Sequence, residues 1–337
     1  MRPTVKDVAA LADVSPKTVS NVLGNADVVA PETRERVERA IERLGYVPNL
    51  AARGLRSGRT GMIALVVPDV RSPFSAELVQ DVVELAHERA LGVQLEQSRT
   101  SVDRTREMMA AARRHHVDGV LLNPATGAQR DEALQIGAGA VPLVMLGEVE
   151  QEDVDQVWVD SVDAARRMTD LLIALGHRRI AMLGVQPPSE GTVTGALRRQ
   201  GYREALTAAG LVIDPALERV CPGWTPKGGY DAMARLLAEQ GRPDAVFCAT
   251  DSIALGALSA LWSAGVRVPD EVSVAGFDDI AEGAYAAPPL TTVRWDKRGY
   301  AAAAIERLVA RIDGSVEPAK RLRFPVEIVR RESVRER

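Results

Sequence analysis

The sequence predicts an α/β protein in which a small all-α helix-turn-helix headpiece precedes a two-lobed body with parallel sheets. Three observations support this prediction. The N-terminal region carries apolar stripes at helical spacing. From Met62 onward, short apolar runs alternate with amphipathic stretches, as they do in β/α units. The length of 337 residues also exceeds one ordinary domain, and positions 61–337 are enough for a large buried core.

The first two predicted helices are joined by a tight turn. Thr4 followed by Asp7 fits a capping box at the start of the first helix, and Asp13 occupies the turn. Ser15 is a good N-cap for the second helix, and Pro16 suits the first helical position because its missing N–H costs nothing there. The apolar positions of the two helices are Val8, Leu11, Ala12, Val14, Val19, Val22 and Leu23.

The second helix presents small and polar side chains that suit the major groove of DNA. The positions left free of the core are Pro16, Lys17, Thr18, Ser20 and Asn21. Lys17 can reach a guanine edge or a phosphate, and Asn21 can pair bidentately with adenine. A third helix is expected from Pro31 to Gly45, a natural C′ residue. Any small three-helix bundle shows similar spacing, so a headpiece without a DNA role stays an alternative.

A basic segment follows the three helices. Residues 48–59 contain three arginines and no acidic residue. Residues 1–59 carry a net charge of +3 and the remainder −7, which together give the −4 of the whole chain. Positive charge at one end of an acidic protein is typical of a phosphate-binding module. We expect this segment to be a poor helix alone and to order on DNA, and an ordinary linker is the alternative.

The headpiece and this segment resemble those of LacI/GalR-type transcriptional regulators. The resemblance rests on Asp7–Ala9, Val19–Leu23, Pro31–Val37 and Leu44–Asn49. It implies a hinge helix over 49–56, with Leu55 as a wedge that kinks DNA from the minor groove. The implied DNA-binding residues are Thr4, Ser15, Pro16, Lys17, Thr18, Ser20, Asn21, Asn25, Tyr46, Asn49, Ala52, Arg53, Leu55 and Arg56. Three positions depart from the family pattern. Asn21 occupies a position that is often Arg in the family, and Ala30 stands where Ser or Thr usually caps the third helix. Gly54 loosens the hinge.

Composition favours a globular protein in the cytoplasm. Hydrophobic residues make up 46% and charged residues 26% of the chain. No charged start precedes an apolar h-region, and no apolar run approaches about 18 residues. Cys221 and Cys248 lack a metal-type spacing, so we expect buried, reduced thiols. The four histidines form no HExxH-type pattern, and we expect neither a metal site nor a cofactor.

Two series of strands and helices are expected in the body. The first series has strands at Met62–Val67, Gly92–Glu96, Gly119–Leu122 and Leu143–Leu146, and helices near Ser75–Arg89, Asp103–Arg114 and Arg130–Gly137. The second has strands at Arg179–Leu183, Ala245–Cys248 and Val272–Ala275, and helices near Ala164–Leu175, Ala196–Ala209, Lys227–Gln240 and Asp251–Ala264. Short apolar runs of this kind are typical of buried parallel strands. Two such lobes suggest a hinged pair with a cleft between them.

The expected organisation is a headpiece over 1–47, a hinge segment over 48–60 and a core over 61–337. A strand at Leu290–Trp295 and a helix at Lys297–Ile312 are expected to return to the first lobe, and a closing strand near Leu322–Val329 to join the second. The first lobe then comprises about 61–160 plus 290–318, and the second about 161–289 plus 319–337.

The body resembles the periplasmic-binding-protein-like core of the same family. The matching segments are Val67–Asp69, Ser72–Phe74, Leu175–Ile180, Ala249–Asp279 and Pro288–Arg294. The resemblance implies that Arg198 and Asp278 hydrogen-bond an effector between the lobes and that Trp224 stacks on it. The further implied effector-binding residues are Asp69, Phe74, Thr250 and Trp295. Taken alone, Arg198 would be a surface arginine, Trp224 a core residue and Asp278 a solvated loop carboxylate or a helix N-cap.

An arginine, a carboxylate and an indole together suit a polyhydroxylated ring, because directed hydrogen bonds fix its hydroxyls while its apolar face lies on the aromatic ring. We therefore expect a sugar or sugar derivative, and a purine or nucleoside fits the same groups as the alternative. Some relatives carry Asp near Gly147, where this chain has Gly147 and Glu148. Trp295 and Lys297 also replace other side chains of the relatives, so the identity of the ligand stays open.

Three classes of function compete: a ligand-responsive repressor, a cytosolic sugar-binding enzyme and a binding protein without a DNA role. The sequence has no GxSxG, no P-loop and no GxGxxG after a strand, which argues against an enzyme. The missing export signal argues against a transport receptor. Of the three classes, only the repressor gives a function both to the N-terminal headpiece and to the two-lobed body. We expect a homodimer on a palindromic operator, in which a ligand shifts the angle between the lobes and the ordering of the hinge.

Overall fold

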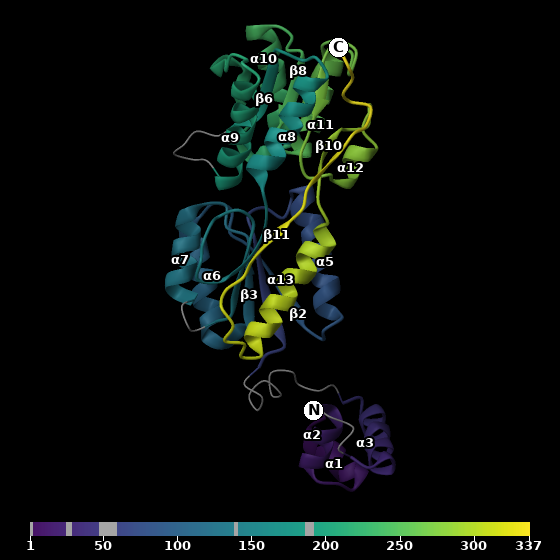
Figure 1. The fold of residues 1–337 in the computed structure, drawn as a ribbon. Helices are drawn as coiled ribbons and strands as arrows, with labels where there is room; N and C mark the ends of the chain where they lie inside the picture. The colour runs from purple at the N-terminus through teal and green to yellow at the C-terminus, as the bar shows by residue number, and fades with distance from the viewer. Residues whose placement is uncertain (1–2, 25–28, 47–58, 138–140, 186–191) are drawn as a thin grey trace. The chain divides into compact units, whose positions relative to one another are not determined.

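The computed structural model describes residues 3–24, 29–46, 59–137, 141–185 and 192–337. The chain divides into two compact units, Met1–Gly61 and Met62–Arg337, and each is described by itself. Figure 1 shows the helices and strands of both units. Within the described ranges, no helix has the length and apolar character needed to cross a membrane.

The first unit is a three-helix headpiece formed by α1 (Val5–Ala12), α2 (Pro16–Gly24) and α3 (Pro31–Leu44). The capping box is present, since Thr4 N–H donates to the Asp7 carboxylate over 2.7 Å and Asp7 N–H donates to Thr4 Oγ1 over 3.4 Å. Ser15 Oγ accepts a 3.1 Å hydrogen bond from the N–H of Thr18 at the start of α2. The buried core consists of Val8, Ala9, Ala12, Val19, Val22, Val37, Ala40 and Tyr46.

The first lobe of the second unit contains a six-stranded parallel sheet. Its strands, in spatial order, are β11 (Arg321–Phe324), β5 (Asp155–Val159), β4 (Leu143–Leu146), β3 (Gly119–Leu122), β1 (Met62–Val67) and β2 (Gly92–Gln97). Helices α5 (Pro73–His87) and α13 (Lys297–Ile312) cover one face, and α6 (Val102–Ala111) with α7 (Gly127–Gly137) cover the other (Figure 1). A π-helical turn, η2 (Ala112–His116), extends α6.

The central strands β1, β3 and β4 are buried on both faces of this sheet, which explains their continuous apolar runs. Side chains alternate along β1, so Ile63 and Leu65 pack in one cluster with Leu78 of α5. Ala64 packs in a second cluster with Met109 of α6. The four apolar runs predicted as the strands of this lobe therefore form β1 to β4.

The second lobe contains a four-stranded parallel sheet. Its strands, in spatial order, are β7 (Glu218–Val220), β6 (Ile180–Val185), β8 (Ala245–Cys248) and β9 (Ser273–Ala275). Its long helices are α8 (Ser161–Ala174), α9 (Val193–Ala208), α10 (Pro226–Gln240) and α11 (Asp251–Ser263). Short turns of helix occur at η3 (Pro215–Leu217), η4 (Pro222–Trp224) and α12 (Ala281–Ala284). Cys221 and Cys248 are both free and buried in this lobe.

Helices α8 and α9 approach each other closely at a glycine. A Cβ atom at Gly201 of α9 would lie 2.1 Å from the carbonyl oxygen of Val162 in α8. Only a residue without a side chain allows the two backbones to come this near. This contact fixes α9, and with it Arg198, against the start of α8.

The late strands correct two predictions. β10 (Thr292–Arg294) does not return to the first lobe, because Gly276 N–H donates to Thr291 O and Asp278 N–H donates to Val293 O, which holds this strand beside the segment after β9. β10 instead pairs antiparallel with β12 (Glu327–Val329). Only α13 makes the predicted return, packing on α5.

The closing strand near 322–329 splits into two. Arg321–Phe324 forms β11 and pairs in parallel with β5 of the first lobe, where the second lobe was expected. Only its later part, β12, lies beside the second lobe through β10. The chain therefore crosses between the lobes after β5, after β10 and after β11.

Candidate effector site and DNA-binding surface

The headpiece presents most of its predicted DNA-binding positions at the surface. Thr4, Ser15, Pro16 and Lys17 are exposed, and Thr18, Ser20 and Asn21 are half-buried. The Ser20 hydroxyl donates to the carbonyl of Pro16 over 2.9 Å, so part of its hydrogen-bonding capacity is used within α2. Lys17 and Asn21 both lie on α2, as the spacing predicts.

One predicted DNA-binding residue lies in the core of the headpiece. The side chain of Tyr46 is only 9% exposed and packs with the apolar residues of α1, α2 and α3. Its ring therefore has a structural role that the sequence pattern did not indicate. The remaining predicted positions lie outside the described residues: Asn25, Asn49, Ala52, Arg53, Leu55 and Arg56.

In the second lobe, Arg198 and Asp278 meet although they lie 80 positions apart in the sequence. Arg198 comes from α9, and Asp278 follows β9 in a loop beyond the carboxyl end of the strand. Arg198 Nη2 lies 3.2 Å from Asp278 Oδ1, and both residues are about 5% exposed. Arg198 also donates to the carbonyl of Ala249, just after β8, and over 3.4 Å to Oγ of Ser161. The carboxyl ends of adjacent parallel strands are where ligands bind in open α/β sheets.

Aromatic rings surround this pair. The guanidinium carbon of Arg198 lies 3.5 Å from the ring centroid of Phe277 and 5.9 Å from that of Trp224. Trp295 packs against Phe277 at 5.9 Å and against Phe74 at 5.7 Å between centroids. Trp224 is half-buried, and its indole N–H donates to Gly184 O over 3.1 Å. Among the described residues, the buried indole N–H of Trp295 has no hydrogen-bond partner.

The electrostatics of the site are set by burial. Burial raises the pKa of Asp278 to about 6, although the positive charges of Arg198 and Lys297 act in the opposite direction. The neighbouring Asp251 is fully buried, and burial together with the charge of Asp278 raises its pKa to about 8. Two neighbouring buried carboxyl groups thus share this part of the interior, and one of them, Asp278, pairs with the Arg198 guanidinium.

The other predicted effector-binding residues divide into two groups. Phe74 and Trp295 belong to the aromatic cluster around Arg198. Thr250 lies beside Ala249, and its hydroxyl caps α11 by accepting from Ile253 N–H over 3.3 Å. Asp69 instead forms hydrogen bonds with Arg71 of its own loop, which hold the pKa of its carboxyl below the usual value. The described contacts therefore do not bring Asp69 to Arg198 or Asp278.

The structure adds Glu148 to the site. Its carboxylate accepts hydrogen bonds from the hydroxyls of Ser161 and Thr194, the latter over 2.7 Å. Ser161 also contacts Arg198, so Glu148 belongs to the same network. The pair Gly147-Glu148 differs from the family pattern at a position where some relatives carry Asp, and that difference was the only signal in the sequence.

Contacts between the lobes lie around this network. Lys297 at the start of α13 pairs with Glu77 of α5 and donates to the carbonyl of Asp279 over 2.9 Å. Glu77 also accepts a 2.9 Å hydrogen bond from the N–H of Ala281. On another side, Val193 N–H donates to Ala125 O over 3.0 Å. Residues of both lobes are thus hydrogen-bonded next to the Arg198–Asp278 pair.

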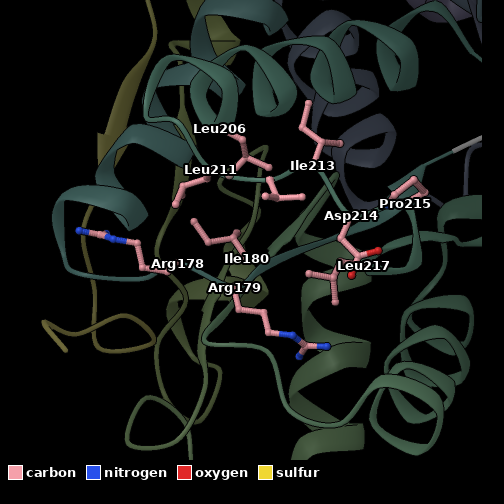
Figure 2. Close-up of a pocket in the computed structure, with 10 residues that line it drawn as sticks. Arg178, Arg179, Ile180, Leu206, Leu211, Ile213, Asp214, Pro215 and Leu217 are labelled. Atoms are coloured by element: carbon pink, nitrogen blue, oxygen red, sulfur yellow. The ribbon is translucent and has the colours of Figure 1, made fainter.

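A separate hollow occurs at the opposite end of the second sheet. Figure 2 shows Ile180, Leu206, Leu211 and Ile213 among its lining residues. Ile180 is the first residue of β6, so the hollow faces the amino ends of the strands. The Arg179 guanidinium beside it donates to the carbonyls of Gln240 and Arg242. Because of its position and its occupied arginine, we do not assign the hollow as the effector site.

Two family models match the chain. That of bacterial regulatory proteins of the lacI family matches residues 4–49, and that of the periplasmic binding protein-like domain matches residues 169–334. The HTH-type transcriptional regulator CelR of Thermobifida fusca is 39% identical over 98% of both chains. The HTH-type transcriptional repressor PurR of Haemophilus influenzae (strain PittEE) is 32% identical, also over 98% of both chains.

Solved structures are similar over the same length. A complex of transcriptional regulator CelR with cellobiose has a TM-score of 0.73 at 37% identity, covering 98% of this chain and 100% of that one. A lac repressor dimer bound to operator and the anti-inducer ONPF has a TM-score of 0.87 at 28% identity, covering 99% and 100%. The similarity therefore extends over headpiece and core together.

Proposed function

Because this chain belongs to the lacI family of bacterial regulatory proteins and is a transcriptional regulator, we propose that it represses transcription and that a sugar bound at Arg198 and Asp278 controls its affinity for operator DNA. The regulator interpretation rests on relatives that match 98% of the chain and are themselves regulators rather than enzymes.

The observation that carries the proposal is the buried Arg198–Asp278 pair among aromatic rings at the carboxyl ends of β8 and β9. A guanidinium group donates to ring hydroxyls and a carboxylate accepts from them, while an indole ring covers the apolar face of a sugar. The buried indole N–H of Trp295, which is unpaired among the described residues, would gain a partner from a ligand oxygen.

A sugar is favoured over a purine as the effector. A regulator named CelR, solved in complex with cellobiose, is 37% identical to this chain, whereas the PurR relative reported above is 32% identical. CelR and PurR relatives each match 98% of this chain, so their identities to it can be compared directly. A purine or nucleoside stays the second candidate because it can stack on Trp224 and pair with Asp278 in the same way.

On the DNA side, we propose that two copies of the chain pair through their cores and place two headpieces on a palindromic operator. The lac repressor structure similar to this chain is a dimer on operator. Effector binding would shift the angle between the lobes and disfavour the hinge conformation that binds the minor groove, so that the operator is released.

A thermal-shift series with cellobiose and guanine tests the effector class. A specific ligand stabilises the folded state by mass action, by about 2.7 kcal/mol at one hundred times its Kd. We expect cellobiose to raise the Tm and guanine to leave it unchanged. A shift with guanine alone would establish the purine alternative, and no shift with either would contradict both.

The role of the pair is tested with Asp278→Asn. The loss of a charged acceptor is expected to weaken cellobiose binding by about 10- to 100-fold, because hydrogen bonds to charged groups contribute about 1.5–3 kcal/mol. Binding is measured by calorimetry, with Asp231→Asn as the control, since Asp231 pairs with Lys227 on the surface of α10. Affinity for a duplex selected by the wild-type protein from random DNA should be equal in both variants. Unchanged cellobiose binding in Asp278→Asn would contradict the site.

The hinge proposal concerns Leu55, which lies outside the described residues. Leu55→Ala is expected to lower affinity for the selected duplex at least tenfold, because a smaller side chain cannot wedge the base step open. Cellobiose affinity should stay at the wild-type value. Equal gel-shift affinity of variant and wild type would contradict the wedge role.

A further inference from the structure

The carboxyl group of Asp251 is fully buried, and neither the DNA-binding surface nor the ligand contacts above give it a role. Asp251 is the first residue of α11, and the side chain of the preceding Thr250 already caps that helix. The Asp251 carboxyl is therefore available for another task.

One oxygen of this carboxyl binds the loop that carries Asp278, and the other binds Thr292 of β10, the strand beside that loop. Ile280 N–H donates to Asp251 Oδ2 over 3.0 Å, and Thr292 Oγ1 lies 2.6 Å from Asp251 Oδ1. A Cβ atom at Gly276 would lie 2.0 Å from Asp251 Oδ1, so the glycine permits the close approach. The Asp251 N–H also donates to Phe277 O over 2.8 Å. Asp251 thus contacts the segment 276–280 on both sides of Asp278.

The loop needs such a restraint because its backbone is unusual. Asp278 has a φ of 113° and Asp279 a φ of 47°, and residues with side chains rarely adopt this region. Thr292 of β10 extends the restraint, since its hydroxyl also accepts from Asp279 N–H over 3.4 Å. The hydroxyl of Thr292 thus binds the strained Asp279, and the carboxyl of Asp251 binds Ile280, the residue that follows it.

We propose that Asp251 is a positioning residue for effector recognition, whose buried carboxyl holds residues 278–280 in the conformation that directs Asp278 to Arg198. This inference rests on the proposed function only in assigning the ligand to Asp278. Its geometric part, the restraint of the loop, is independent of any ligand.

Two substitutions at Asp251 distinguish the effect of its hydrogen bonds from the effect of filling a buried position. Asp251→Ala removes both hydrogen bonds. Asp251→Asn keeps the shape, an oxygen that accepts from Ile280 and an amide that donates to Thr292. Because burial raises the pKa of Asp251 to about 8, the neutral amide is a close mimic at pH 7. Thr292→Val is a second test, since it removes one hydroxyl at constant shape without touching Asp251.

Hydrogen exchange of the ligand-free, full-length protein measures the restraint directly. We expect the amides of residues 278–280 to exchange at least tenfold faster in Asp251→Ala than in wild type, with a smaller increase in Thr292→Val. Asp251→Asn should stay within about threefold of wild type. Asp231→Ala serves as the surface control. Calorimetry with cellobiose then tests recognition, and we expect at least tenfold weaker binding to Asp251→Ala and near-wild-type binding to Asp251→Asn.

The outcomes are distinguishable. Faster exchange confined to 276–281 in Asp251→Ala, restored in Asp251→Asn, supports the positioning role. Unchanged loop exchange overturns it, and so does an equal acceleration throughout the second lobe, which would make Asp251 a residue of general stability. If wild type does not bind cellobiose, the proposed effector fails while the exchange data still decide the restraint. If wild type binds and Asp251→Ala binds equally well, the role in recognition is overturned.

Discussion

Arg198 and Asp278 hold opposite charges in a nearly water-free interior, and each reduces the energetic cost of burying the other. Removing one partner of such a pair typically costs about 3–5 kcal/mol, because an uncompensated charge stays behind. The contacts of Arg198 with the Ala249 carbonyl and the Phe277 ring further reduce the energetic cost of burying its charge. These contacts hold the polar groups of the pair in a fixed orientation, as the proposed role in effector binding requires.

The raised pKa values of Asp278 and Asp251 predict that stability falls as pH rises. Both native pKa values, about 6 and about 8, lie above the value of 3.8 for an unrestrained Asp. Between pH 4 and pH 8 these two carboxyl groups therefore bind more protons in the native than in the unfolded state, and their contribution to the free energy of unfolding decreases as pH rises. Above pH 6 the contribution of Asp251 falls by about 1 kcal/mol per pH unit.

Urea unfolding at pH 6, 7 and 8 checks this prediction. Asp251→Asn has no proton to lose, so its free energy of unfolding should fall less steeply over this range than that of wild type. Asp231→Asn, on the surface of α10, should retain the wild-type slope. Parallel slopes for wild type and Asp251→Asn would contradict a raised pKa at Asp251.

At the scale of single residues, the family resemblance predicted which residues of the candidate site meet, and local pattern did not. Arg198, Trp224 and Asp278 stand apart in the sequence, and each taken alone had an ordinary structural interpretation. Their meeting depends on the order of strands in the second sheet, which no local signal encodes. Asp251 and Glu148 were missed as contributors because a carboxylate at the start of a helix or in a loop is usually solvated. Tertiary packing buries Asp251 fully and Glu148 in part.

At the scale of elements, strands that are apolar throughout were predictable and strands that bury a charge were not. β1, β3, β4 and β8 are uninterrupted apolar runs and coincide with the predicted ranges. β5 begins with Asp155, which is fully buried because Arg307 and Arg311 of α13 pair with it. The charge broke the apolar pattern, and its partners lie more than 150 residues away. β11 was misplaced for a different reason: its residues alternate between exposed and half-buried at the edge of the sheet, so no apolar run marks it.

The contact between α8 and α9 predicts a strong effect of a single methyl group. Gly201→Ala would place Cβ 2.1 Å from the Val162 carbonyl, so the helices must separate. Overpacking of this kind costs about 1–3 kcal/mol, measurable as a lower urea midpoint. Gly127→Ala at the start of α7 is the control, because the nearest atom to its Cβ is the end of the flexible Arg130 side chain at 3.7 Å. Equal stability of the two variants would contradict a close helix contact.

At the scale of the whole core, the two lobes are joined by three chain crossings and by hydrogen bonds around the site. Thr194 to Glu148, Ala281 to Glu77 and Lys297 to the Asp279 carbonyl each link residues of different lobes. Each of these bonds requires the lobes to be near one another, so each favours a closed arrangement over an open one. A ligand held by Arg198 and Asp278 would act on the same equilibrium.

Thr194→Val tests this coupling without altering a proposed ligand contact. It removes the hydroxyl that donates to Glu148 over 2.7 Å and keeps the shape of the side chain. The loss of about 1 kcal/mol from the closed arrangement should weaken cellobiose binding about fivefold. It should also raise, by a similar factor, the cellobiose concentration that half-releases the selected duplex, because coupling between sites is reciprocal.

Thr207→Val is the matched control for this substitution, since the Thr207 hydroxyl donates to the Arg203 carbonyl within α9 at an exposed position. Fluorescence anisotropy of the labelled duplex, titrated with cellobiose, measures both variants. If Thr194→Val and Thr207→Val release the duplex at the same cellobiose concentration, the hydrogen bond to Glu148 does not favour the state that binds effector. The switch would then depend on the other hydrogen bonds between the lobes, such as those from Ala281 to Glu77 and from Lys297 to the Asp279 carbonyl.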